Sequence, residues 1–251
     1  MLTSQQGKKE KKKKILTFLY KTVRLREKNT GADSFMPEKN FKLIVCNALY
    51  PLLLPHIKKD TDVKILDIGL HTSPRRLRER VQGEIENMEE KGVDILLGYG
   101  LCGRGLEGVC STKSRLILPR IDDCVGALLG SRDRHRKILK KHPGSFFIEP
   151  TWLDTEMNIF DGLSQGMEHL SADQRNRVIA IALKHYKTIA MLVTGKPDSR
   201  AVRRCEHHAE AHSLELLRIP TDLTLLERLM RGPLDPASFV ITPIGEPIPF
   251  F

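Results

Sequence analysis

The chain has 251 residues, enough to bury a substantial core as one large domain or as two small lobes. Its content of 40% hydrophobic and 29% charged residues is ordinary for a soluble globular protein. The net charge is +10, but residues 1–40 hold eleven Lys and Arg against four Asp and Glu, so the rest of the chain is nearly neutral. Basicity is therefore mainly a property of this N-terminal extension.

The extension opens with GKKEKKKK and continues ILTFLYKTVRL. Thr17, Tyr20 and Lys21 interrupt its apolar run too early for a secretory signal, which needs roughly 7–15 apolar residues. We expect a solvated tail that leads into a short amphipathic helix. Attraction of residues 1–40 to nucleic acid or to anionic lipid is the alternative.

The remaining apolar runs and the cysteines favour a cytoplasmic protein without a membrane span. The longest run, residues 43–55, is broken by Asn47, Pro51 and Pro55 and falls short of the roughly 18 residues that a span needs. The 5 cysteines are widely spaced and include no CxxC pair. This disfavours a disulfide framework and leaves metal binding, catalysis or packing.

The first predicted lobe, residues 41–150, alternates strands with helices. Its strands are expected at residues 41–49, 62–71, 93–100 and 114–120. A helix follows the second strand, with Ser73 as its cap and Pro74 in its first turn. A further helix is expected from about Asp123 until Pro143 stops it. This alternation predicts a mainly parallel sheet wrapped by helices.

A second, smaller α/β lobe is predicted over residues 171–251, after a crossover at residues 151–170. Helices are expected at residues 171–186, 199–214 and 223–232, and strands at residues 187–195, 215–222 and 238–245. Ser171 is the expected cap of the first of these helices. The predicted fold class is therefore α/β, with two Rossmann-like lobes of mainly parallel sheets.

Four chemically active side chains follow the strands of the first lobe. They are Cys46, His71, Cys102 and Cys124. Because ligands bind at the carboxyl ends of strands in parallel α/β sheets, we expect a site at this edge. Three thiolates and an imidazole suit tetrahedral zinc, and such ligands also hold iron–sulfur clusters. The alternative is that these cysteines only pack, as small buried hydrophobes.

The stretch LLGYGLCGRG, residues 97–106, contains Gly98, Gly100, Gly103 and Gly105. Such glycines let backbone N–H groups approach a sulfur or a phosphate closely, so a cofactor-binding or phosphate-binding loop is an alternative function. The dinucleotide fingerprint also requires a helix after the glycines. The strand expected at residues 114–120 follows too soon for a full helix to fit well.

Two further features carry weaker interpretations. On the helix expected at residues 199–214, Cys205, His208 and His212 share one face and form a rival candidate metal site. We interpret this segment as a polar surface helix. Trp152, the only tryptophan, is interpreted as a core or lobe-interface anchor, with a lid over the site as the alternative.

The stretches DIGLHTSPRRLRERV, LLGYGLCGRGLEGV, LILPRIDDCVGALLGSRDR and HPGSFFIEPTWLD occur in this order. Together with the ending LTLLERLMRG…FVITPIGEPI, they resemble an uncharacterised prokaryotic family, domain of unknown function sixteen thirty-eight. The positions that match the family's motifs are Cys46, His71, Cys102, Arg120, Asp123 and Cys124. The lysine-rich N-terminus, Cys110, Cys205 and the histidines of residues 207–212 depart from the pattern.

The resemblance implies a setting in anaerobes and methanogens, near corrinoid-dependent methyl transfer. We therefore expect an iron–sulfur cluster or zinc on the four Cys and His residues, with Asp123 as a base or as a partner of a ligand, and Arg120 as an anion anchor. If the protein is an enzyme, methyl or thiol transfer fits such a site, or electron transfer if the metal is iron. The expected partners are a small molecule or a corrinoid protein.

Two alternatives from other classes stay open. The first is a non-catalytic module that binds a cofactor or a phosphate group through residues 98–105. The second is a nucleic-acid-binding protein that acts through residues 1–40.

Overall fold

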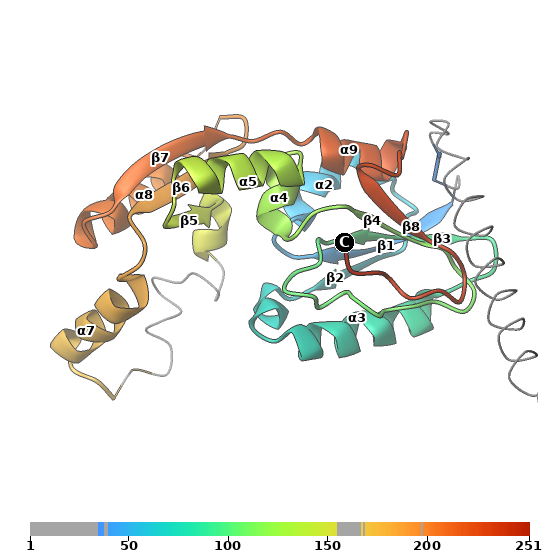
Figure 1. Ribbon diagram of the computed structural model, residues 1–251, viewed down its shortest axis with the longest axis horizontal. Helices are drawn as coiled ribbons and strands as arrows, with labels where there is room; N and C mark the ends of the chain where they lie inside the picture. The colour runs from blue at the N-terminus through green and yellow to red at the C-terminus, as the bar shows by residue number, and fades with distance from the viewer. Residues whose placement is uncertain (1–34, 38–39, 155–166, 168, 197) are drawn as a thin grey trace, which may run out of the picture. The chain divides into compact units, whose positions relative to one another are not determined.

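The computed structural model describes residues 35–37, 40–154, 167, 169–196 and 198–251. Residues Met36–Phe251 form one compact unit that contains two β-sheets (Figure 1). The predicted mixed α/β fold with mainly parallel sheets is confirmed. The tail and amphipathic helix predicted within residues 1–34, and the crossover residues 155–166, lie outside the described residues.

The first sheet has five strands in the order β2–β1–β3–β4–β8. Four of them are parallel: β1 (Phe41–Cys46), β2 (Val63–Leu66), β3 (Asp94–Gly98) and β4 (Leu116–Pro119). β8 (Phe239–Thr242) pairs antiparallel with β4. β1 and β3 lie inside the sheet with almost every residue buried, which explains their unbroken apolar sequences.

Helices cover both faces of this sheet. α3 (Pro74–Met88) lies on one face and α9 (Thr224–Arg231) on the other (Figure 1). α3 begins where the sequence predicts it, because the Ser73 hydroxyl accepts a hydrogen bond from the backbone N–H of Arg76. Two short elements, α2 (Tyr50–Leu53) and η1 (Leu54–His56), follow β1. None of the described helices is long and apolar enough to cross a lipid bilayer.

The second sheet is parallel, in the order β5–β6–β7. Its strands are β5 (Ser145–Ile148), β6 (Thr188–Val193) and β7 (Glu215–Pro220). α7 (Ala172–Leu183) begins with the predicted cap Ser171, which forms a capping box with Gln174. α8 (Ser199–Ala211) buries Cys205 and Ala209 in the core of this sheet. β5 is absent from the sequence prediction, since its four residues directly follow a helix stop and show no alternation.

The helix predicted from residue 123 to residue 142 is two helices in the structure. α4 (Cys124–Leu128) ends before Gly130, which has a φ of +74°, and α5 (Arg132–Lys141) begins after it with Ser131 as its cap. A left-handed residue cannot continue a helix, and a Cβ at Gly130 would lie 2.7 Å from the Asp222 carboxyl carbon. The break leaves α4 a single short turn of helix that starts at Cys124.

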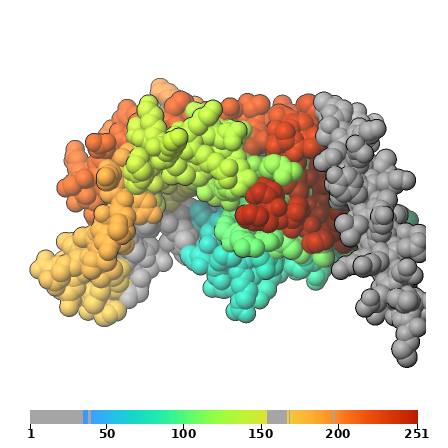
Figure 2. Space-filling model, viewed as in Figure 1, coloured from blue at the N-terminus to red at the C-terminus, as the bar shows by residue number. Residues whose placement is uncertain are grey.

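The strand predicted at residues 238–245 joins the first sheet, although the sequence prediction places it in the second lobe. As β8 it covers the edge of β4 that would otherwise expose unpaired backbone groups. The chain then runs back along the loop after β3, where Gly245 donates to Ser111 O and Gly108 and Ile248 are linked by a backbone hydrogen bond. Figure 2 shows this C-terminal segment, in red, at the surface against the green segment.

The side chain of Glu89 ties the end of α3 to the loop before β4. Its carboxylate accepts hydrogen bonds of 2.7 Å from the Ser111 hydroxyl and from both the backbone N–H and the hydroxyl of Thr112. The hydrogen bond from Ser111, with those from Thr112, outweighs the effect of burial and lowers the pKa of Glu89 from 4.5 to about 2. The ionised form therefore stabilises the fold above about pH 4.5, and this contribution is lost as the pH falls toward 2.

We expect Glu89→Gln to lower the free energy of unfolding by about 1–2 kcal/mol at neutral pH, because charged acceptors form the stronger hydrogen bonds. The variant should also lose less stability than the wild type between about pH 4.5 and pH 2. Urea unfolding at several pH values measures both effects. Glu210→Gln, at an exposed position of α8, is the control. Identical profiles for wild type and Glu89→Gln would contradict this role.

Candidate metal centre

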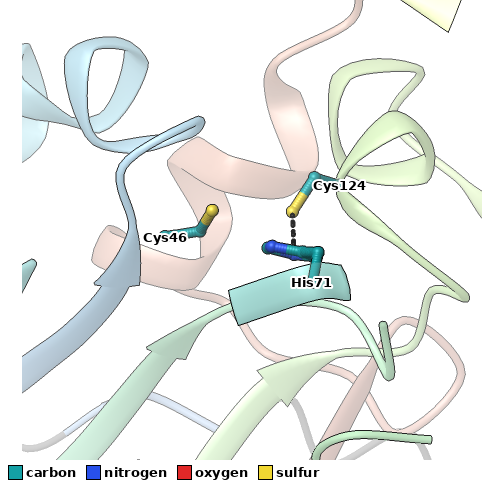
Figure 3. Close-up of side chains that lie close together, drawn as sticks. All are labelled: Cys46, His71 and Cys124. Carbon is teal, nitrogen blue, oxygen red and sulfur yellow. Dashed lines mark hydrogen bonds between the residues drawn. The ribbon is translucent and has the colours of Figure 1, made fainter. Parts of the chain in front are cut away.

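Three side chains at the carboxyl ends of parallel strands of the first sheet point toward one another (Figure 3). Cys46 is the last residue of β1, His71 lies in η2 (Ile68–Thr72) after β2, and Cys124 is the first residue of α4 after β4. Their ligand atoms, two Sγ and one imidazole nitrogen, all lie within 4.8 Å of one another. Sγ of Cys124 is 3.7 Å from Nε2 of His71. We call these residues the Cys/His triad.

Local backbone contacts orient two members of the triad. Nδ1 of His71 lies 2.9 Å from the carbonyl oxygen of Ile68 and donates to it, which leaves Nε2 to face the sulfur atoms. Asp67 starts η2 by accepting a hydrogen bond of 2.6 Å from Gly69 N–H. Sγ of Cys46 accepts a hydrogen bond of 3.4 Å from Ala48 N–H. The triad is thus oriented by its own strand ends before any metal binds.

Cys102 lies beside the triad in a left-handed backbone conformation, with a φ of +47°. Its N–H donates to the carbonyl of Asp122 at 2.8 Å, which ties the loop after β3 to the segment that leads into α4. The side chain is buried, and its thiol is close enough to Cys124 and His71 for both to affect its pKa. A non-glycine residue rarely adopts this conformation unless its surroundings enforce it. The structure thus brings Cys46, His71 and Cys124 within reach of one ion, and Cys102 lies outside that group of ligand atoms.

The pKa values of the three cysteines and His71 are shifted in different directions. The interaction with Cys124 lowers the pKa of Cys102, and burial raises it. His71 lowers it further, and the resulting pKa is about 6. The hydrogen bond with Cys124 also lowers the pKa of Cys46 despite burial. Burial disfavours the charged form of His71, but its hydrogen bond to Cys102 and the nearby thiolate charges raise its pKa to about 9. The hydrogen bonds to Cys102 and Cys46, and then burial, raise the pKa of Cys124.

At neutral pH the group therefore holds a Cys102 thiolate beside a protonated His71, with Cys124 as a neutral thiol. Nucleophilic sulfur and replaceable protons lie together in a buried site. A metal ion would replace those protons, because thiolate and neutral imidazole are the ligating forms.

Sequence reasoning missed Tyr99, which directly precedes the glycine-cysteine loop. Its ring stacks on His71, with centroids 6.0 Å apart, and its hydroxyl is buried without a hydrogen-bond partner among the described residues. Burial and then the charge of Cys46 raise its pKa. From the sequence, an aromatic residue in an apolar stretch is expected to lie in the core. No local signal distinguishes such a core residue from one that contacts the site.

The glycines of the loop are accounted for by close packing within the protein. An added Cβ would lie 2.7 Å from the Val45 side chain at Gly98, 2.6 Å from the Leu77 side chain at Gly105, and 2.7 Å from a backbone nitrogen at Gly100. Gly103 has a φ of +65°. These contacts explain the glycines without a phosphate ligand.

The two predicted polar residues lie in different surroundings. Asp123 caps α4 by accepting a hydrogen bond of 3.0 Å from Gly126 N–H, and its side chain borders the triad's cavity described below. Arg120 donates to the carbonyl of Pro236 and lines a separate cavity of 430 Å³ with Arg132 and Arg136. Burial and then the charge of Arg132 lower the pKa of Arg120. Asp123 thus adjoins the triad, whereas Arg120 belongs to the second cavity.

A mainly apolar cavity of 240 Å³ opens beside the triad. Its lining residues are Ala48, Ile68, His71, Asp123, Cys124, Val125 and Trp152. Trp152 comes from η3 (Pro150–Asp154), and its indole N–H donates to the carbonyl of Ala48 at 3.1 Å. Trp152 also packs against the hydrophobic core of the second sheet, which agrees with its interpretation as a core or lobe-interface anchor, and it lines the cavity as well.

The rival cluster on α8 is not assembled as a metal site. Cys205 is 1% exposed and packs in the core of the second sheet, where burial raises its pKa to about 11. The rings of His208 and His212 stack 6.4 Å apart. Among the described residues, only the Cys/His triad has three His, Cys, Asp or Glu ligand atoms close enough to share an ion.

Comparison with known proteins identifies a family without a known function. The family described as "Protein of unknown function (DUF1638)" matches residues 65–230, a range that includes His71, Cys102 and Cys124. No curated protein matches the chain. Among solved structures, the RedJ thioesterase from the prodiginine biosynthetic pathway in Streptomyces coelicolor is 12% identical over 81% of this chain and 91% of that chain. Its TM-score of 0.19 is too low to support any argument about fold or activity.

Gly100→Ala tests how the loop holds the site. The new Cβ would lie 2.7 Å from the backbone nitrogen of Asp123, which cannot move without displacing Cys124. We expect a loss of about 1–3 kcal/mol in the free energy of unfolding, measured in urea. Gly83→Ala is the matched control, since nothing lies within 4 Å of its Cβ in α3, and it should stabilise by about 0.5–1 kcal/mol. Equal effects of the two substitutions would contradict the packing role of Gly100.

Proposed function

The chain belongs to the DUF1638 family of proteins of unknown function, and from its site we propose that it binds zinc or an iron–sulfur cluster through Cys46, His71, Cys102 and Cys124. One observation carries this proposal: the ligand atoms of Cys46, His71 and Cys124 lie within 4.8 Å of one another, although the residues come from separate strand ends. Packing alone does not require the sulfur and nitrogen atoms of three side chains to face a common point.

The chemistry of the donor set supports these metals. Thiolate and imidazole ligands select zinc and iron–sulfur clusters, whereas magnesium and calcium prefer oxygen. The bond from His71 Nδ1 to the backbone is the outer contact that commonly fixes a ligating histidine. Cys102 supplies a thiolate at neutral pH, since its pKa is about 6.

We propose a reactive centre in which Cys46, His71 and Cys124 are the permanent ligands. Catalytic metal sites keep one position open, whereas structural sites are closed by four protein ligands. The apolar cavity reaches His71 and Cys124 directly and gives a second molecule access to the centre. Cys102 would fill the remaining position when no other ligand is bound.

A metal thiolate of this kind suits methyl or thiol transfer, or electron transfer if the metal is iron. Methyl transfer with a corrinoid protein is the specific form that the family resemblance suggests. Within this proposal Asp123 orients the start of α4 and borders the cavity. Arg120 would anchor an anionic group in its own cavity and would not act at the metal.

Anaerobic purification followed by elemental analysis and ultraviolet–visible spectroscopy tests the proposal. The wild type should carry near-stoichiometric metal, and the Cys102→Ala/Cys124→Ala variant should lose most of it, because two of the three thiolates are removed. Cys110→Ala/Cys205→Ala is the matched control, since it removes two cysteines outside the site, and it should keep the metal. Circular dichroism of each variant shows whether it has folded.

The spectrum separates the two metals. Iron with a broad visible absorption would establish a cluster and favour electron transfer, whereas colourless zinc would favour thiolate-based transfer. A wild-type protein that stays metal-free after reconstitution with either would disprove the proposal.

A further inference from the structure

We infer that the apolar cavity beside the triad binds the compact alkyl group of a small thiol, whose sulfur takes the open position at the metal. This inference rests on the proposed metal centre and goes beyond it by naming the class of molecule that the centre receives. The juxtaposition of an apolar cavity with His71 and Cys124 carries it.

The size and walls of the cavity define the group that fits. Its volume is 240 Å³, and an engineered protein cavity of about 150 Å³ already admits benzene. The walls away from the triad come from Ala48, Ile68, Val125 and Trp152. An alkyl group of a few carbons would therefore be buried against hydrocarbon and an indole ring, which favours apolar over polar ligands.

The walls of the cavity disfavour an alkyl group that carries a carboxylate or a phosphate. No lysine or arginine is among the residues that line it, and its one carboxylate, that of Asp123, is engaged by Gly126 N–H. A carboxylate or phosphate placed against the apolar walls, away from His71 and the metal, would be buried without a counter-charge, which is costly. Arginines line the separate cavity of Arg120, Arg132 and Arg136 instead.

The ligands of the centre favour a sulfur donor. Zinc and iron that are held by thiolates bind a further soft sulfur readily. In the binding step the bond between Cys102 and the metal would break, and the S–H bond of the incoming thiol would break as its sulfur binds the metal. The proton would pass to the released Cys102 thiolate. No oxidant or reductant is needed, because the sulfur and the metal keep their oxidation states.

Trp152 provides a direct readout, since it is the only tryptophan of the chain and lines the cavity. The metal-loaded protein is titrated anaerobically with propane-1-thiol and with 2-mercaptoethanol, and Trp152 fluorescence is followed. The two thiols have the same number of heavy atoms and differ by a methyl group against a hydroxyl. We expect propane-1-thiol to bind about tenfold more tightly, because the hydroxyl finds few partners in the cavity.

Val125→Phe fills the cavity from one wall, and Ile68→Phe fills it from another. Each should weaken propane-1-thiol binding by about tenfold or more while the metal content stays at the wild-type level. Val178→Phe makes the same substitution on α7, where the side chain is 37% exposed, and should change neither quantity. Metal content and circular dichroism, measured first, show that each variant has folded and is loaded.

The outcomes separate this inference from the proposed function. If the protein is loaded but binds both thiols equally, or if both cavity-filling variants bind propane-1-thiol like the wild type, the cavity inference is wrong and the metal centre stands. Equally tight binding of propane-1-thiol to metal-free Cys102→Ala/Cys124→Ala would also overturn it, since the sulfur would then not need the metal. A wild type without metal overturns both.

Discussion

The candidate site depends on the parallel pairing of β2, β1, β3 and β4. Parallel strands end at the same edge of a sheet, and the register sets how far each end projects. Here Cys46 pairs with Leu66 and Val45 pairs with Gly98, so the loops that carry His71 and Cys102 start level with Cys46. A slip of one residue would turn Cys46 to the opposite face of the sheet. The chemistry of the site is therefore set by sheet register as much as by the ligands themselves.

The second constraint is the free energy cost of burying charged side chains at the apolar carboxyl edge of the first sheet. A buried thiolate or imidazolium is unfavourable unless each finds a partner. The proximity of His71 and Cys124 lowers the pKa of Cys102, whereas the pKa of Cys124 is raised and its thiol stays neutral. The unpartnered hydroxyl of Tyr99 lies in the same surroundings. Buried charges and an unpartnered hydroxyl that lie together in this way are typical of a functional site and not of a packed core.

Local signals in the sequence predicted a large part of the fold and the members of the site. Ser73 and Ser171 mark helix starts through their side-chain chemistry, and short apolar runs identify the central strands. The ends of those runs then predict Cys46, His71, Cys102 and Cys124. Long-range contacts could not be predicted in this way: β8 pairs with a strand about 120 residues earlier, and the hydrogen bond from Trp152 to Ala48 spans 104 residues. The cavity and its separation from Arg120 depend on such contacts.

The pairing of β8 with β4 also sets an order of events during synthesis. β1 to β4 leave the ribosome long before β8, so the growing chain carries Cys46, His71, Cys102 and Cys124 while the edge of β4 is still uncovered. The loop of residues 108–111 gains its backbone bonds to Gly245 and Ile248 only when the last residues emerge. A thiol that reacts with a metal or an oxidant before the last residues emerge does so while the first sheet is still incomplete. The cysteine thiols of the site are thus most accessible while the chain is still being made.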